Sequence, residues 1–140
     1  MKKIDKAIHT FNNQKNCAQS VLGAYAEEYN LDEELLHKLS TAFGGGMGHT
    51  NGVCGAVSGG LMVLGLKHNW EQFDKEKTYA QTRHLTEEFI RRNGTRDCEK
   101  LIGVDLMTEE GKKKFKEDNI KKNVCEKCIT DVIDIIENQT

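Results

Sequence analysis

Five of the 140 residues are cysteines, and four of them come shortly after a residue that often caps a helix. These are Cys17 after Asn16, Cys54 two residues after Gly52, Cys98 after Asp97, and Cys125 two residues after Asn123. An apolar helical pattern follows each one, so we expect four sulfurs in the first turns of four helices. A helix N-terminus carries about half a positive charge and unpaired N–H groups, so it favours the thiolate. The pattern therefore predicts a protein in which several reactive cysteine thiols are brought together.

Two chemistries could use these four thiolates. In thiol–disulfide exchange, one thiolate attacks a disulfide and a second thiol resolves the product. Cys54 is the candidate nucleophile because we expect the preceding glycine loop to expose it, and Cys17 is a candidate resolving partner. The protein would then be a thiol–disulfide oxidoreductase acting on a redox partner protein or a small thiol.

In the alternative, Cys17, Cys54, Cys98 and Cys125 ligate a metal ion or an iron–sulfur cluster, with His49 as a further candidate ligand. The long separations between the cysteines do not match the compact Cys-x-x-Cys pairs of zinc modules, although distant residues can meet in a fold. A third interpretation is a structural or binding module whose cysteines are inert core residues. The sequence leaves these alternatives open and requires no cofactor.

Cys128 makes a second kind of pair with Cys125, because residues three apart on a helix share a face. Such a Cys-x-x-Cys pair has the geometry of helical dithiol motifs. A thioredoxin-like motif would follow a strand, and the sequence predicts none there. Cys128 is therefore either an auxiliary thiol or an ordinary core position.

Composition excludes several classes of partner. The 20 basic and 22 acidic residues give a net charge of −2, which provides no electrostatic footprint for nucleic acid or for an anionic membrane. The charged start, Met1–Lys6, lacks the apolar segment of a secretory signal, so we expect a cytoplasmic location. Reduced cysteines there are more often catalytic or metal-binding than paired in disulfides. The composition is also compatible with a homo-oligomer.

The elements that must position the cysteines are all helical, in one domain over residues 1–140. Apolar spacing predicts helices over residues 4–11, 16–29, 32–43, 53–66, 69–92, 98–102 and 123–136, with a lysine-rich helix after Thr108. Asn69 and Gln72 form a capping box for the fifth of these helices. Nothing in the chain alternates as a strand would.

Glycine marks the segment before Cys54 and the helix after it. Residues 44–52 hold five glycines and predict a loop with backbone conformations that other residues avoid. In the helix that follows, the small residues Gly55, Ala56, Gly59, Gly60 and Gly65 favour close approach of neighbouring helices, or space beside a cofactor or substrate. We expect this helix to be buried at the centre of the domain.

A basic stretch precedes the last helix, and its lysines are Lys112, Lys113, Lys114, Lys116, Lys121 and Lys122. Acidic residues such as Glu109 and Glu117 interleave with it, which is typical of a solvated helix face. Docking of an electron-transfer partner is the alternative.

The cysteine segments together resemble the C_GCAxxG_C_C family of small redox-active proteins. The box is Cys54-Gly55-Ala56-Val57-Ser58-Gly59, Cys17 lies upstream, and Cys98 and Cys125 follow it. The glycine-rich lead-in at residues 43–48 is similar too. The resemblance extends over nearly the whole chain and implies a redox function for these four cysteines, with Cys128 as an addition to the pattern.

Overall fold

The computed structural model describes residues 1–68 and 74–139, and it is all-α. Its helices are α1 (Lys3–Phe11), α2 (Cys17–Gly23), α3 (Glu33–Ser40), the 3₁₀ turn η1 (Thr41–Phe43), α4 (Gly44–His49), α5 (Gly55–Leu66), α6 (Lys75–Asn93), α7 (Cys98–Ile102), α8 (Glu109–Glu117), the π turn η3 (Lys121–Cys125) and α9 (Glu126–Asn138). The described residues contain one isolated β-bridge, between Val53 and Asp97, and they form no β-strand of greater length.

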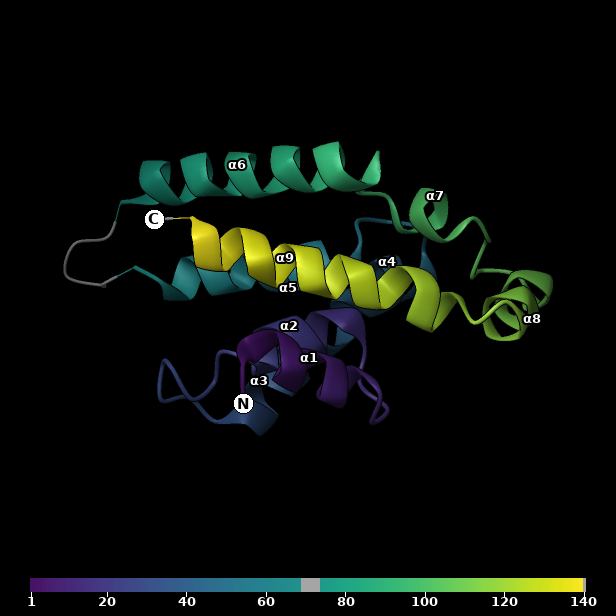
Figure 1. Cartoon of the computed structure of the whole chain (residues 1–140), viewed down its shortest axis with the longest axis horizontal. Coiled ribbons are helices and arrows are strands. Elements are labelled where there is room, and N and C mark those ends of the chain that lie inside the picture. The colour runs from purple at the N-terminus through teal and green to yellow at the C-terminus, as the bar shows by residue number, and fades with distance from the viewer. Residues whose placement is uncertain (69–73, 140) are drawn as a thin grey trace.

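Helices α5 and α9 lie side by side in the middle of the molecule (Figure 1). Helix α6 packs on one side of this pair, and α1 and α2 pack on the other, with α3 outside α2 (Figure 1). Helices α7 and α8 lie together at one end (Figure 1). Most of the largest fully buried side chains come from α2, α5, α6 and α9 and include Val21, Val57, Leu64, Leu85, Phe89, Ile129 and Val132.

The small residues of α5 serve close packing, as the sequence predicts. A Cβ on Gly59 would lie 2.7 Å from the Ala18 carbonyl oxygen of α2, and a Cβ on Gly60 would lie 2.6 Å from a Val132 methyl group of α9. Both distances are shorter than van der Waals contact, so glycine lets two helices approach α5 from different sides. Gly65 differs, because nothing lies within 4 Å of the position its Cβ would take.

Several predicted helix boundaries are confirmed. The side chains of Asp32 and Thr108 accept backbone N–H groups at the starts of α3 and α8, and Gly94 ends α6 in the left-handed conformation at φ 84°. The capping box predicted at Asn69 and Gln72 lies outside the described residues. Helix α6 begins at Lys75 instead, where the Asp74 side chain accepts the N–H groups of Glu76 and Lys77.

Two predictions about the N-terminal half are wrong. Helix α2 ends at Gly23 rather than near Tyr29, and the chain continues in turns up to Asn30, which has φ 52°. The sequence pattern of α3 predicts that Leu35, Leu36 and Leu39 all face inward, but only Leu36 is buried, whereas Leu35 and Leu39 are exposed. Leu36 and the buried Ser40 are four residues apart and so occupy the inward face, which leaves the other two leucines outside.

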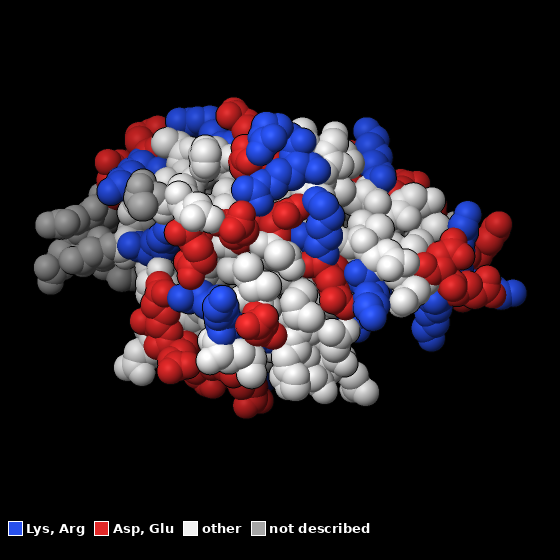
Figure 2. Space-filling view, in the orientation of Figure 1, with Lys and Arg blue, Asp and Glu red and all other residues white. Residues whose placement is uncertain are grey.

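Acidic and basic side chains mix over the face of the molecule shown in Figure 2. This mixing agrees with the near-balance of charges in the sequence. In the described part of the chain, no helix combines the length and the apolar character needed to cross a bilayer.

Candidate functional site

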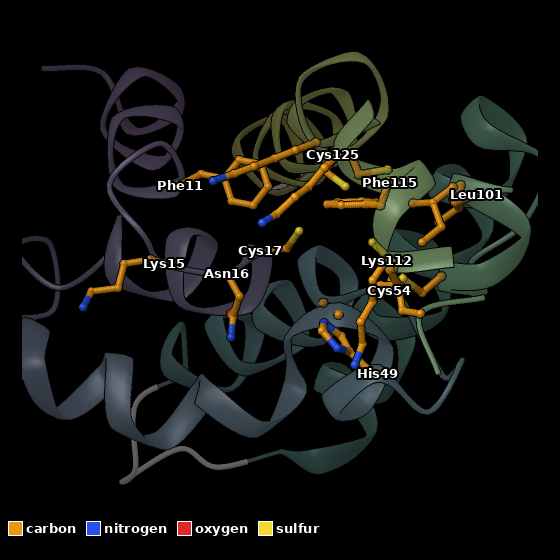
Figure 3. A pocket seen from close by; sticks show the side chains of 18 of the residues that line it. Phe11, Lys15, Asn16, Cys17, His49, Cys54, Leu101, Lys112, Phe115 and Cys125 are labelled. Carbon is orange, nitrogen blue, oxygen red and sulfur yellow. The ribbon is translucent and has the colours of Figure 1, made fainter. Parts of the chain in front are cut away.

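All five cysteines line one pocket at the end of the molecule where α7 and η3 meet α4 and the start of α5. The pocket has a volume of about 590 Å³. Figure 3 shows Cys17, Cys54 and Cys125 around it, together with Phe11 and Phe115. None of the five cysteines is more than 9% exposed. The sequence prediction that distant cysteines meet in space is therefore confirmed.

The isolated bridge between Val53 and Asp97 brings Cys54 next to Cys98. The Cys54 N–H group donates to the Arg96 carbonyl at 2.8 Å, and the Cys98 N–H group donates to the Gly52 carbonyl at 2.9 Å. These two bonds join the entry to α5 to the entry to α7. Two residues that are far apart in the chain are thus held in fixed positions on one wall of the pocket.

The glycine-rich segment before Cys54 forms a left-handed turn in α4. Residues 45–49 all have φ between 63° and 73°, a region that glycine enters freely and other residues seldom adopt. The turn closes with a 2.9 Å bond from the Gly52 N–H group to the Gly46 carbonyl. A Cβ on Gly46 would lie 2.6 Å from the Cys98 Cβ, so this glycine makes room for Cys98. Met47 and His49 adopt the same conformation without glycine's freedom, which is a local strain beside the pocket.

The expectation that this loop exposes Cys54 is wrong. Cys54 is 5% exposed, and its backbone N–H group is bonded to the Arg96 carbonyl. Cys54 therefore borders the pocket and not the outer surface. His49 lies at the pocket with an exposed side chain over Gly45.

Cys17 is held at the first position of α2 by a capping box. The Asn16 side chain accepts the Gln19 N–H group at 2.9 Å, and the Gln19 side chain accepts the Asn16 N–H group at 2.9 Å. Asn16 also donates to the Thr41 carbonyl at 2.9 Å, which fixes the start of α2 against η1. The predicted position of Cys17 at a capped helix start is confirmed.

Cys125 does not lie at a helix start, so that prediction is wrong. It is the last residue of the π turn η3, which continues without a break into α9, and its φ of −64° and ψ of −38° are helical. The helical path begins before Asn123, so this residue caps nothing. The predicted shared face is correct, because Cys125 and Cys128 both line the pocket.

The thiols fall into two pairs that the sequence did not indicate, Cys54 with Cys128 and Cys17 with Cys125. The neighbouring Cys128 thiol is the largest cause lowering the pKa of Cys54. Burial acts in the opposite direction, and the backbone N–H groups of Ala56 and Val57 lower the pKa further. The thiol of Cys128 is itself harder to ionise, because Cys54 and burial raise its pKa far above the ordinary value.

The second pair is Cys17 with Cys125, and its effect on the helix-start cysteine is the reverse. The neighbouring Cys125 thiol, together with burial, raises the pKa of Cys17 well above its ordinary value of 9.0. Burial, followed by the nearby Cys54 and Cys125, raises the pKa of Cys98 to about 12. The predicted stabilisation of the thiolate by a helix N-terminus therefore applies to Cys54 and is wrong for Cys17 and Cys98, whose thiols are buried without a donor.

A metal ion shared by these cysteines would need side-chain movement. In residues 1–68 and 74–139, no three His, Cys, Asp or Glu side chains are arranged to hold one ion. The thiols stand as pairs, which is the arrangement that disulfide chemistry requires.

Sequence reasoning missed the other walls of the pocket. Apolar side chains come from α1, α7, α8 and the segment between the last two, and lysines come from three parts of the chain. These residues are Phe11, Leu101, Ile102, Leu106 and Phe115, with Lys15, Lys112, Lys113, Lys116 and Lys121. The basic stretch was visible in the sequence, but nothing there places it over the cysteines.

Comparison with known proteins agrees with this cysteine arrangement. Residues 15–139 match the model of the family described as "Putative redox-active protein (C_GCAxxG_C_C)".

The chain belongs to the C_GCAxxG_C_C family.

A curated relative from Archaeoglobus fulgidus, named "Uncharacterized protein", is 27% identical over 124 residues, which cover 80% of this chain and 82% of the relative. No solved structure gives a significant match. The Cys54 box and the cysteines at 17, 98 and 125 all lie within the matched range.

Proposed function

We propose that this member of the C_GCAxxG_C_C family performs thiol–disulfide exchange, with Cys54 as the attacking thiolate and Cys128 as the resolving thiol. The observation that carries the proposal is the environment of the Cys54 sulfur. The neighbouring Cys128 thiol and the N–H groups of Ala56 and Val57 lower its pKa, although the sulfur is buried. A lowered pKa makes more of the nucleophilic form available.

This assignment changes the expected partner of Cys54. The sequence offered Cys17 as a resolving thiol without fixing the pairing. Cys17 is paired with Cys125 instead, whereas Cys128 is the thiol that acts most strongly on Cys54. The thiol that neighbours the nucleophile is the better placed to form a disulfide with it.

The reaction of the reduced protein with an external disulfide, R–S–S–R, then has two steps. The Cys54 thiolate attacks one sulfur of the external disulfide, forms a Cys54–S–S–R bond and releases the first RS⁻. Cys128 then loses its proton to water or to the departing RS⁻, and its sulfur attacks the Cys54 sulfur. The Cys54–Cys128 disulfide forms and the second RS⁻ leaves. In total the protein loses two electrons, and R–S–S–R is reduced to two thiols.

The test starts from the fully reduced protein in the absence of oxygen, with bis(2-hydroxyethyl) disulfide as a neutral oxidant. We expect peptide mapping by mass spectrometry to find Cys54 joined to Cys128 as the first disulfide. With Cys128→Ser, the mixed disulfide on Cys54 should accumulate instead. A first disulfide between Cys17 and Cys125, or no oxidation at all, would contradict the assignment.

An iron–sulfur cluster is the second candidate, and one observation favours it. All five sulfurs line a single pocket that lysines also border, and positive charge stabilises an anionic thiolate cluster. Cys17, Cys54, Cys98 and Cys125 would be the ligands. Purification without oxygen, followed by visible absorption and iron and sulfide analysis, separates the two functions. Iron bound with four protected thiols would replace the dithiol assignment. A protein whose five thiols neither bind iron nor react would be a structural or binding module.

A further inference from the structure

The pocket has a positive border, although the chain as a whole carries a net charge of −2. The border lysines come from three separate segments: Lys15 precedes α2, Lys121 begins η3, and Lys112, Lys113 and Lys116 lie on α8. Lys15 and Lys112 appear at opposite sides of the pocket in Figure 3. Glu109 is the one carboxylate among the lining residues, and its side chain is 94% exposed.

Carboxylates of the protein leave much of this positive charge unpaired. Lys112 lies 3.5 Å from Glu109, and Lys113 lies 3.8 Å from Glu117, both as exposed pairs. Within the described part of the chain, no carboxylate lies within 4.0 Å of Lys15, Lys116 or Lys121. Lys121 instead lies over the Phe11 ring at 4.5 Å from its centroid, which places its charge at the border between the apolar wall and solvent.

Below the lysines the walls are apolar, and the sulfurs lie at the inner end. The aromatic rings of Phe11 and Phe115 and the side chains of Leu101 and Ile102 surround the approach to the cysteines. A volume of about 590 Å³ is in the range of sites for small molecules. Because Cys54 is 5% exposed and Cys128 is 2% exposed, a disulfide on the surface of a folded protein could not reach them.

From this arrangement we propose that the pocket binds a small organic disulfide whose short hydrocarbon arms end in carboxylates. The carboxylates would lie against Lys116, Lys121 and their neighbours, the arms against Phe11 and Phe115, and the S–S bond toward Cys54. This inference rests on the proposed function, because the bound molecule is the external disulfide of that reaction. Cys54 attacks its S–S bond, Cys128 completes the protein disulfide, and two thiol carboxylates leave.

The experiment compares three disulfides of similar length as oxidants of the reduced protein without oxygen. These are 3,3′-dithiodipropionate with two negative charges, neutral bis(2-hydroxyethyl) disulfide, and cystamine with two positive charges. At low ionic strength we expect dithiodipropionate to react about tenfold faster than the neutral compound and cystamine to react slowest, and 0.5 M salt should remove most of the difference. Equal rates for the three compounds, after correction for their reactivity toward a free thiol, would overturn the inference and leave the proposed function standing.

A matched pair of variants tests whether the border lysines cause the preference. K116Q/K121Q removes two charges that line the pocket, whereas K114Q/K122Q removes two charges from the same segments outside it. We expect only the first variant to lose the preference for dithiodipropionate over the neutral disulfide. An equal loss in both variants would mean that overall charge, and not the pocket, causes the effect.

Binding can also be measured without any redox step. Octanedioate has the same number of chain atoms between its carboxylates as dithiodipropionate, with two methylene groups in place of the two sulfurs. We expect it to shift the NMR signals of Leu101, Ile102 and Phe115 in wild type and K114Q/K122Q and to shift them much less in K116Q/K121Q. If no thiol exchange occurs but this binding does, the proposed function fails and the carboxylate site remains. If octanedioate shifts none of these signals, or an acidic unfolded peptide disulfide reacts faster than dithiodipropionate, the small-molecule site is wrong.

Discussion

Cys54 and Cys17 each stand at the start of a helix, and each is paired with a cysteine near the start of the C-terminal helix. The paired thiol is the largest influence in both cases, but the pKa of Cys54 falls whereas the pKa of Cys17 rises. The two helix starts also differ in the cap. At α2 the Asn16 side chain takes the Gln19 N–H group, whereas at α5 Cys54 is itself the N-cap residue, and the N–H groups of Ala56 and Val57 lower the pKa of its thiol. A helix start therefore favours the thiolate where the cysteine is the cap residue.

Replacing the two helix-start cysteines one at a time gives the largest test of this comparison. Cys54→Ser should slow oxidation by bis(2-hydroxyethyl) disulfide by roughly 10³-fold, since it removes the covalent nucleophile. Cys17→Ser should leave the rate close to that of wild type, because the Cys17 thiol is protonated at neutral pH. Far-UV circular dichroism checks that both variants keep their helices. A larger loss in Cys17→Ser would assign the attacking sulfur to the other pair.

The pH dependence of alkylation tests the difference in pKa between buried cysteines in the wild-type protein. A thiol reacts with iodoacetamide as the thiolate, so its rate rises as the pH increases through its pKa. Cys54 should reach half its maximal rate below pH 9.0, while Cys98 should do so only near pH 12. At pH 8 the larger thiolate fraction of Cys54 outweighs the lower intrinsic nucleophilicity of a low-pKa thiolate, so Cys54 should be labelled about tenfold faster than Cys98 or more. Peptide mapping after timed alkylation measures both rates in one sample, and equal rates would contradict the contrast.

The two cysteines of the C-terminal segment offer a smaller test. Cys128→Ala removes the thiol that most lowers the pKa of Cys54, so the first step should slow a few-fold, the scale of one polar interaction of about 1 kcal/mol. It should also stop the second step, so the mixed disulfide accumulates. Cys125→Ala is the matched control, three residues earlier on the same face, and should do neither. Accumulation in Cys125→Ala alone would reverse the roles of these two residues.

Local signals in the sequence predicted the helices and the gathering of the cysteines, but not their pairing. Caps such as Asp32 and Thr108 act within one turn, so their residue types can be recognised without the fold. The π turn that places Cys125 inside a continuous helix has no comparable local signal, and Asn123 therefore suggested a false helix start. The pairing of Cys54 with Cys128 depends on how α5 packs on α9, and the lysines over the pocket depend on where α8 lies. Both features depend on tertiary packing, which the spacing of residues in the sequence does not specify.

The close approach of α2 and α5 keeps the two pairs in one pocket, and two glycines of α5 test it with the smallest expected effect. In Gly59→Ala the new Cβ meets the Ala18 carbonyl at 2.7 Å, and because this neighbour is backbone, α2 must shift. We expect a loss of about 1–3 kcal/mol in the free energy of unfolding, together with faster labelling of Cys17 as its helix moves away. Gly65→Ala meets nothing within 4 Å and should instead stabilise the protein by about 0.5–1 kcal/mol, the advantage of alanine over glycine inside a helix. Urea unfolding of both variants measures the free energies. If Gly59→Ala were as stable as Gly65→Ala, the contact between α2 and α5 could not be what holds Cys17 beside Cys54.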